Sequence, residues 1–283
     1  MSIDKLLPLP PLEANSAADL IATVLKSEVN RAGFNKVVLG LSGGIDSALS
    51  LALAVKALGN ENVLAIRMPY KSSSPDSLEH AALICKELGV SFETINITGM
   101  VEGLVGQIPD CQGLRKGNVM ARARMITLYD FSAAKNALVI GTGNKTEALL
   151  GYSTLWGDMA CAINPVGDLY KKQVRDLSTY LEVPTPIIDK PPSADLWVGQ
   201  TDEEEMNLSY DLADRLLYQL IDQGTPESRV REHMIELGLP LESLERVLYK
   251  VRLNQYKRIM PVIVKVSDVT IGREFRYPRD WGT

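Results

Sequence analysis

Hydrophobic and polar positions follow two alternating patterns along the first half of this chain. Short apolar runs bounded by turn residues predict buried strands, and longer stretches with apolar residues at helical spacing predict helices. The expected strands are residues 36–41, 63–68, 91–95 and 137–140. The expected helices are residues 16–32, 46–58, 77–88 and 118–135, with a further helical stretch around Val101.

This alternation predicts an α/β fold, a doubly wound, Rossmann-like parallel sheet covered by helices on both faces. Ligands of such sheets bind beyond the carboxyl ends of the strands. After Gly151 the strand pattern fades, and additional C-terminal helices are expected over residues 168–181, 202–222, 226–237 and 241–259, with a Pro-rich irregular segment at 184–201. We expect one domain over residues 1–283, with an N-terminal extension at 1–15 and a partly extended tail at 260–283.

Composition narrows the class of protein. The chain has 283 residues, 46% hydrophobic and 23% charged, which is typical of a globular protein. Its net charge of -5 argues against a nucleic-acid-binding surface. Pro8, Pro10 and Pro11 interrupt the N-terminal apolar segment, unlike a signal peptide, and no apolar run is long enough to span a membrane. We therefore expect a cytoplasmic protein without nucleic-acid or membrane partners.

Cysteine and histidine are too scarce for the commonest metal and triad chemistry. Cys85, Cys111 and Cys161 are odd in number and form no C-x-x-C pair, which disfavours a disulfide framework or a zinc knuckle. His80 and His233 are too far apart in sequence for an H-E-x-x-H site. The chemistry of any site is therefore expected to use other groups.

The most informative segment follows the first strand and reads Gly40-Leu41-Ser42-Gly43-Gly44-Ile45-Asp46-Ser47. Successive small residues let backbone N–H groups converge on an anion at a helix N-terminus. The segment lacks both the Walker A lysine and the dinucleotide G-x-G-x-x-G pattern. An acid beside a polyphosphate implies a divalent cation between them, because Mg²⁺ is held by carboxylates and phosphate oxygens. The alternative is a tight turn whose aspartate merely begins a helix.

The S-G-G-x-D-S pattern resembles the pyrophosphate loop of the N-type ATP pyrophosphatases, which split ATP between its α and β phosphates and adenylate a substrate. Four further segments, G-T-G-N-K-T-E (141–147), G-Y-S-T-L-W-G-D (151–158), D-L-Y-K-K (168–172) and K-P-P-S-A-D-L (190–196), resemble NAD synthetase. The resemblance covers about residues 36–257. It implies an adenine nucleotide alpha hydrolase-like fold and a homodimer that makes NAD from deamido-NAD, ATP and ammonia, releasing AMP and pyrophosphate.

The resemblance also implies the roles of particular residues. ATP would contact the loop Gly40 to Ser47 together with Thr142, Lys171 and Ser193, and Mg²⁺ would be held by Asp46 and Glu147. Deamido-NAD would contact Asn118, Arg122, Tyr256 and Lys257. Asp158 would lie near the reacting carboxyl and the incoming ammonia, where a carboxylate accepts the proton of ammonium. Mg²⁺ and the Lys171 cation would offset the repulsion between the two anionic substrates.

Each of these residues also has a structural alternative. Arg122 and Arg124 fit a solvated helix face, an interpretation preferred for Arg124. Glu147 fits a first-turn helix acid, Asp158 a turn former, and Lys171 a surface pair with Lys172. The acidic run 202–205 is interpreted as a helix start, and Cys161 as inert packing.

Three positions depart from the pattern of ammonia-dependent members, which commonly have a Lys at Leu155, an Asp at Ala162 and a His at Tyr256. The segment T-L-W-G-D-M-A and the tail G-R-E-F-R-Y-P are more similar to the synthetase domain of glutamine-dependent enzymes. Only about 35 residues precede the first strand, so no glutaminase domain is expected. Nitrogen would arrive as free ammonia or from a separate glutaminase. The alternative functions are another adenylating ATP pyrophosphatase and a non-catalytic ATP or AMP binder.

Overall fold

A four-stranded parallel sheet lies at the centre of the computed structural model, which describes residues 2–193, 201–259, 261–271 and 274–275. The strands are β1 (Val37–Gly40), β2 (Val63–Arg67), β3 (Ser91–Thr94) and β4 (Leu138–Ile140). Their spatial order is β3-β2-β1-β4, and Val37 pairs with Val63 on one side and Leu138 on the other. All four predicted strands are confirmed.

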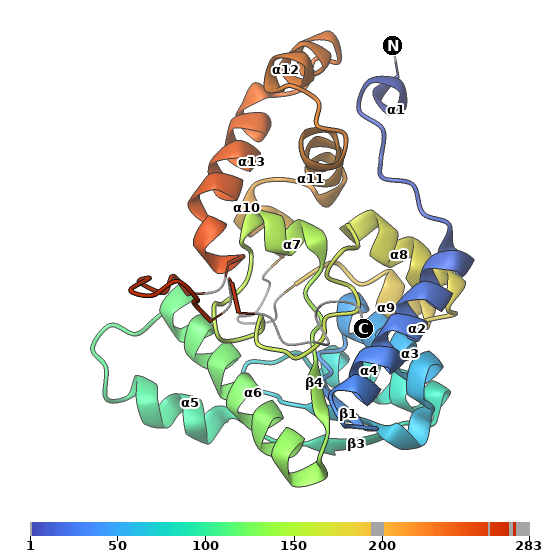
Figure 1. Ribbon diagram of the computed structural model, residues 1–283, viewed down its shortest axis with the longest axis vertical. Coiled ribbons are helices and arrows are strands. Elements are labelled where there is room, and N and C mark those ends of the chain that lie inside the picture. The colour runs from blue at the N-terminus through green and yellow to red at the C-terminus, as the bar shows by residue number, and fades with distance from the viewer. Residues whose placement is uncertain (1, 194–200, 260, 272–273, 276–283) are drawn as a thin grey trace.

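Helices cover both faces of this sheet (Figure 1). The layer on one face contains α2 (Ala14–Arg31), α3 (Ile45–Leu58), α4 (Pro75–Leu88), α8 (Lys171–Tyr180) and α9 (Thr185–Ile188), and that on the other contains α5 (Thr98–Val105) and α6 (Leu114–Lys135). Val37 and Leu39 of β1 pack into the first layer, whereas Val38 packs into the second with Met120. Alternate residues of a strand point to opposite faces, so this alternation confirms the doubly wound arrangement.

A third group of helices lies beyond the carboxyl ends of the strands (Figure 1). It consists of α7 (Lys145–Leu150), α10 (Asp202–Met206), α11 (Tyr210–Leu217), α12 (Glu227–Glu236) and α13 (Leu241–Leu253). These helices share their own apolar core, which includes Leu150, Met206, Leu216 and Val247. Leu7, which follows the short helix α1 (Ile3–Leu6), is buried in the same core and ties the N-terminal segment to these helices.

The structure corrects some predicted helix boundaries. The helix predicted over residues 202–222 is interrupted at Asn207, whose φ of +49° ends α10, and the side chain of Ser209 begins α11. Residues 218–222 then continue as a π-helical turn. The helix predicted over 241–259 ends at Leu253, followed by a 3₁₀ turn at 255–257. No helix in the described part of the chain is long and apolar enough to cross a bilayer.

Candidate active site

The polar loops after β1 and β4 meet at the point where the strand order reverses. The chain continues from β1 to β2 and β3 on one side and returns to β4 on the other, which makes the carboxyl ends of β1 and β4 the topological switch point. Residues 40–47 follow β1, and residues 141–147 follow β4. Both loops line a cavity of about 740 Å³, the location expected for a ligand.

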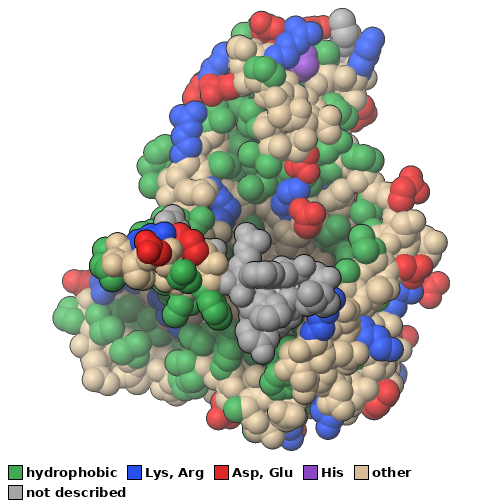
Figure 2. Space-filling view, in the orientation of Figure 1, with side chains coloured by type: hydrophobic (Ala, Val, Ile, Leu, Met, Phe, Trp, Pro, Cys, Tyr) green, Lys and Arg blue, Asp and Glu red, His purple; other side chains and the backbone are tan. Residues whose placement is uncertain are grey.

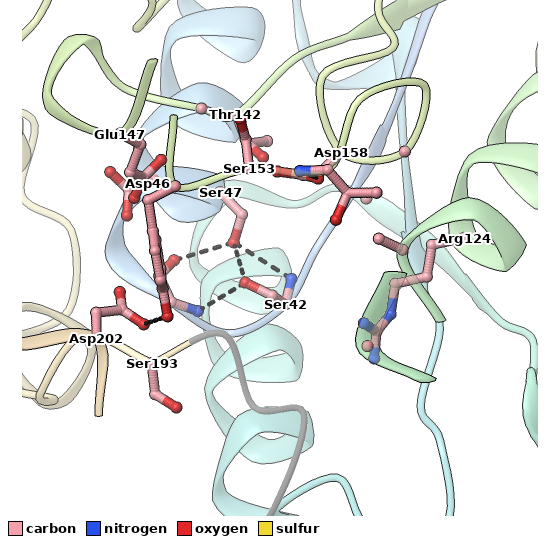
Figure 3. Close-up of a pocket in the computed structure, with 18 of the residues that line it drawn as sticks. Ser42, Asp46, Ser47, Arg124, Thr142, Glu147, Ser153, Asp158, Ser193 and Asp202 are labelled. Atoms are coloured by element: carbon pink, nitrogen blue, oxygen red, sulfur yellow. Dashed lines mark hydrogen bonds between the residues drawn. The ribbon is translucent and has the colours of Figure 1, made fainter. Parts of the chain in front are cut away.

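Two serine hydroxyls stabilise the loop between β1 and α3 (Figure 3). The Ser42 hydroxyl accepts from the Gly44 backbone N–H at 3.2 Å. The Ser47 hydroxyl accepts from the Ser42 backbone N–H at 3.3 Å and donates to the Gly44 carbonyl at 3.0 Å. The loop is thus fixed at the N-terminus of α3, where backbone N–H groups and the helix dipole favour an anion.

The loop requires glycine at position 43. Its φ is +79°, and a Cβ there would lie 2.1 Å from the backbone oxygen of Ser77. We expect Gly43→Ala to lower the free energy of unfolding by about 3 kcal/mol, because strain and overlap add. Gly44→Ala is the matched control, since its φ is -94° and its Cβ would lie 3.4 Å from Ser42 Oγ. Urea unfolding measures both variants, and equal losses would contradict this account.

Asp46, Glu147 and Lys171 form a cluster at the end of the loop, in which the lysine is buried and the two acids are half-buried. The Lys171 Nζ contacts Asp46 Oδ2 and lies 3.7 Å from Glu147 Oε1. Lys171 is only 2% exposed, so the interpretation of a surface pair with Lys172 is wrong. Asn144 contacts both acids: its Nδ2 donates to Asp46 Oδ1 at 2.8 Å, and its backbone N–H donates to Glu147 Oε2 at 3.1 Å.

A second polar layer supports this cluster from behind. The Lys171 Nζ lies 4.9 Å from the centre of the Tyr210 ring, and the Tyr210 hydroxyl donates to Asp202 at 3.1 Å. Asp202 also accepts from Tyr152 at 3.0 Å. Asp214, fully buried, accepts from the Thr146 hydroxyl and from the Lys172 backbone N–H, which fixes the start of α8. These contacts fix the position of the Lys171 backbone.

Burial dominates the electrostatics of the cluster. Burial, reinforced by repulsion from Asp46, raises the pKa of Glu147 to about 8. Burial opposes the charge of Lys171, but the adjacent Asp46 and Glu147 outweigh it and raise the pKa of that ammonium. The cluster therefore holds more acidic groups than one lysine neutralises, and it favours a further cation.

This imbalance predicts a pH-dependent stability. The folded protein binds a proton at Glu147 more tightly than the unfolded chain does, so this contribution is complete below the ordinary pKa of 4.5 and is lost as the pH rises to 8. We expect the melting temperature in EDTA to fall over this range, and Glu147→Gln to remove a loss of up to about 5 kcal/mol, at about 1.4 kcal/mol per pKa unit. Glu87→Gln, at an exposed position, is the control. An unchanged pH dependence in Glu147→Gln would contradict the assignment.

Asp158 lies on the loop after α7, on another wall of the cavity (Figure 3). Its Oδ1 accepts from the Thr154 backbone N–H at 2.7 Å, so it also stabilises a turn. Burial raises the pKa of Asp158, against the opposing effects of that hydrogen bond, Lys257 and Arg124. The Lys257 Nζ donates to the carbonyls of Gly151 and Ser153 at 2.7 and 2.8 Å and so holds the same loop.

The residues expected to contact deamido-NAD line the same cavity and hold the loop that carries Asp158. Asn118 accepts from the Thr154 hydroxyl at 2.7 Å, and Arg122 donates to the Leu155 carbonyl at 3.1 Å. Tyr256 is 57% exposed on the cavity lining. The structure therefore brings the N-terminal part of α6 and the turn that follows α13 together on one wall of the cavity.

With the exception of Gly43, every predicted site residue lines this one cavity. Other residues that line the cavity had no recognisable signal in the sequence. Arg124 was assigned to a solvated surface, but it is half-buried and donates to the Met68 carbonyl at 3.2 Å. Asp202 does begin a helix as predicted, yet it is buried on the cavity wall. Asn144 lies behind the lining, and its N-x-x-E spacing was the available signal of a capping box.

The chemistry of the donor set fits Mg²⁺. Asp46 and Glu147 are hard oxygen donors, and both already contact a single cation, the Lys171 ammonium. In the described part of the chain, no three His, Cys, Asp or Glu residues form a metal cage. Mg²⁺ takes one or two carboxylates and completes its shell with water and phosphate oxygens.

Fold and cavity together define an adenine nucleotide alpha hydrolase-like protein, with a phosphate-binding loop at the switch point of a parallel sheet. The chain belongs to the NAD synthase family, which it matches over residues 18–261. The family places it among the ligases of NAD biosynthesis, which form a C–N bond and use ATP.

Individual relatives agree with this assignment. The NH(3)-dependent NAD(+) synthetase of Pelodictyon phaeoclathratiforme is 53% identical over 272 residues, or 95% of this chain and 96% of the relative. The structure of NMN synthetase from Francisella tularensis superposes with a TM-score of 0.79 at 31% sequence identity. The match covers 90% of this chain and 99% of the Francisella chain. The NH3-dependent NAD synthetase from Campylobacter jejuni has a TM-score of 0.75 at 33% identity, covering 90% of this chain and 100% of its own.

Proposed function

We propose that this chain is an NAD synthetase that amidates deamido-NAD with ammonia through an adenylated intermediate. One observation carries the proposal: a phosphate-binding loop, two carboxylates and a buried lysine line the same cavity as a further carboxylate, Asp158, and the family's dinucleotide contacts. This combination supplies what the reaction needs at each of its two steps. Amidation requires an activated carboxyl, and activation requires two anions to approach each other.

ATP binds at the loop end of the cavity. Backbone N–H groups of residues 40–47 and the N-terminus of α3 receive the phosphates, and Thr142 and Ser193 lie on the walls around them. Asp46 and Glu147 would hold Mg²⁺, which neutralises phosphate charge and the departing pyrophosphate. The Lys171 ammonium adds a fixed positive charge beside the same phosphates.

In the first step, a carboxylate oxygen of the nicotinate attacks the α phosphorus of ATP, and the bond from that phosphorus to the bridging oxygen of pyrophosphate breaks. In the second step, ammonia attacks the carbonyl carbon, and AMP leaves. Only neutral ammonia has a free lone pair on nitrogen to act as the nucleophile, so one proton of ammonium must be removed first. Asp158 accepts that proton, because burial raises its pKa towards that of a useful base and it lies on the cavity wall.

Deamido-NAD lies against the wall formed by Asn118, Arg122, Tyr256 and Lys257. We propose that a second copy of the chain completes this wall as a homodimer. Apolar side chains gather over α5 and α6 on the face shown in Figure 2, and those more than 40% exposed are Met100, Leu104, Leu114, Ile126 and Tyr129. Such a patch marks an interaction surface. Light scattering of the purified protein at twice the mass of the chain would support the dimer, and a monomeric mass would contradict it.

The organisation predicted from the sequence also stays a proposal. We propose one catalytic domain over residues 1–283, a cytoplasmic location, and nitrogen delivered as free ammonia or by a separate glutaminase.

The test is NAD formation from ATP, Mg²⁺ and deamido-NAD with either ammonium or glutamine as the nitrogen source. We expect NAD from ammonium and none from glutamine alone. No NAD from ammonium would overturn the proposal. A second acceptor belongs in the assay, because the Francisella tularensis NMN synthetase superposes well on this chain. If nicotinic acid mononucleotide were amidated and deamido-NAD were not, the chain would be an NMN synthetase.

A further inference from the structure

Asn144 contacts both candidate metal carboxylates, as Lys171 does, yet neither the sequence pattern nor the relatives assign it a role. It lies between β4 and α7 and is fully buried. Its Nδ2 donates to Asp46 Oδ1 at 2.8 Å, and its backbone N–H donates to Glu147 Oε2 at 3.1 Å. Asp46 lies in the first turn of α3 and Glu147 in the first turn of α7, so Asn144 is a direct link between the two halves of the switch point.

The orientation of the Asn144 amide is fixed by its partners. Its Oδ1 accepts from the Glu147 backbone N–H at 2.9 Å, and its Nδ2 faces a carboxylate. A reversed amide would place oxygen against oxygen and N–H against N–H, so only one orientation satisfies both contacts. The side chain therefore caps α7 and holds Asp46 at the same time.

These contacts leave one oxygen of each carboxylate facing the same point. Asp46 Oδ1 and Glu147 Oε2 are used by Asn144, whereas Asp46 Oδ2 and Glu147 Oε1 both face the Lys171 ammonium. The ammonium shows that the two remaining oxygens face one side of the cluster and accept positive charge there. Groups that orient metal ligands in this way commonly change metal affinity about 10–100-fold when they are removed.

We propose that Asn144 is a positioning residue that presents one oxygen of Asp46 and one of Glu147 to a single cation position. It does not touch substrate; it acts through the two acids. The inference rests on the proposed function for the identity of the cation, Mg²⁺ bound with ATP.

Asn144→Ser separates the two contacts of the side chain. Serine is a good N-cap and keeps the acceptor for the Glu147 N–H, but it has no amide donor for Asp46. Ser209→Ala is the matched control, because it removes the cap of α11, where the Ser209 hydroxyl accepts from the Leu212 N–H at 3.3 Å. Asn144→Thr, another cap former, is the second variant if the serine variant is unfolded at the assay temperature.

The readout is Mn²⁺ binding in the presence of α,β-methylene-ATP, measured by the electron paramagnetic resonance of free Mn²⁺. We expect Asn144→Ser to raise the Mn²⁺ dissociation constant about tenfold and Ser209→Ala to leave it unchanged. In turnover, the Mg²⁺ concentration for half-maximal rate should rise similarly, with the KM for deamido-NAD unchanged.

Mn²⁺ affinity equal to that of the parent protein in both Asn144 variants would overturn the inference, and so would an equal loss in Ser209→Ala. The Mn²⁺ measurement requires no turnover. If the binding shifted but no NAD formed, the inference about Asn144 would hold while the proposed function failed.

Discussion

Asp46→Asn is expected to lower kcat/KM for NAD formation by about 10³-fold, because metal charge stabilisation is worth several kcal/mol and each tenfold loss in rate corresponds to about 1.4 kcal/mol. The amide keeps the size of the side chain but removes its charge. Asp46 contacts both Lys171 and Asn144, so the substitution also releases the lysine from its fixed position. Steady-state kinetics over a range of Mg²⁺ concentrations measures the effect.

Asp176→Asn is the matched control for that variant. Asp176 lies on α8 and pairs with Lys172 at the surface, where ion pairs contribute little. Its substitution should leave kcat/KM within about twofold of the parent value, since surface changes are usually near neutral. A kcat/KM for Asp46→Asn as high as that of this control would rule out a role for Asp46 in the reaction.

Lys171→Met should lower kcat by about 10²–10³-fold, the range found when one fixed charge-stabilising donor is removed. Methionine fills a similar volume without a cation, so Asp46 and Glu147 would remain buried without their partner. The loss should therefore extend to stability, because removing one member of a buried ion pair is strongly destabilising. Pyrophosphate release from ATP with deamido-NAD measures the rate, and circular dichroism measures the folded fraction.

The neighbouring lysine provides the control for this prediction. Lys172 is also at the start of α8, but its Nζ pairs with Asp176 and its side chain is more than a third exposed. Lys172→Met should keep near-parental activity and stability. If both lysine variants were equally active, the role of Lys171 would be excluded.

Local sequence patterns were sufficient to predict the strands of the sheet and both loops of the site. The strands around residues 37 and 138 are apolar runs, and each is followed by a glycine-rich polar turn. These two turns were expected to lie close together because the strands pair in parallel, and the carboxyl ends of parallel strands lie at the same edge of the sheet. The sequence therefore predicted which loops form the site.

Local patterns could not predict contacts between residues that are far apart in the sequence. Lys171 has a lysine neighbour and a polar helix after it, and only the fold shows that Asp46, far away in the chain, buries it. Arg124 was assigned to solvent for the same reason, although Met68 on another loop binds it. The break at Asn207 was hidden because the apolar residues at 206, 210, 213 and 217 keep helical spacing across it. Packing of Leu7 against the C-terminal helices left no local signal.

The most direct test of the account follows oxygen from deamido-NAD labelled with ¹⁸O in its nicotinate carboxylate. Attack on the α phosphorus predicts one ¹⁸O in the phosphate of AMP and none in pyrophosphate, with NAD formed from ammonium in equal amount. Mass spectrometry of the three products measures all of these. Label in pyrophosphate, or NAD formed without labelled AMP, would contradict adenylation of the carboxyl at this site.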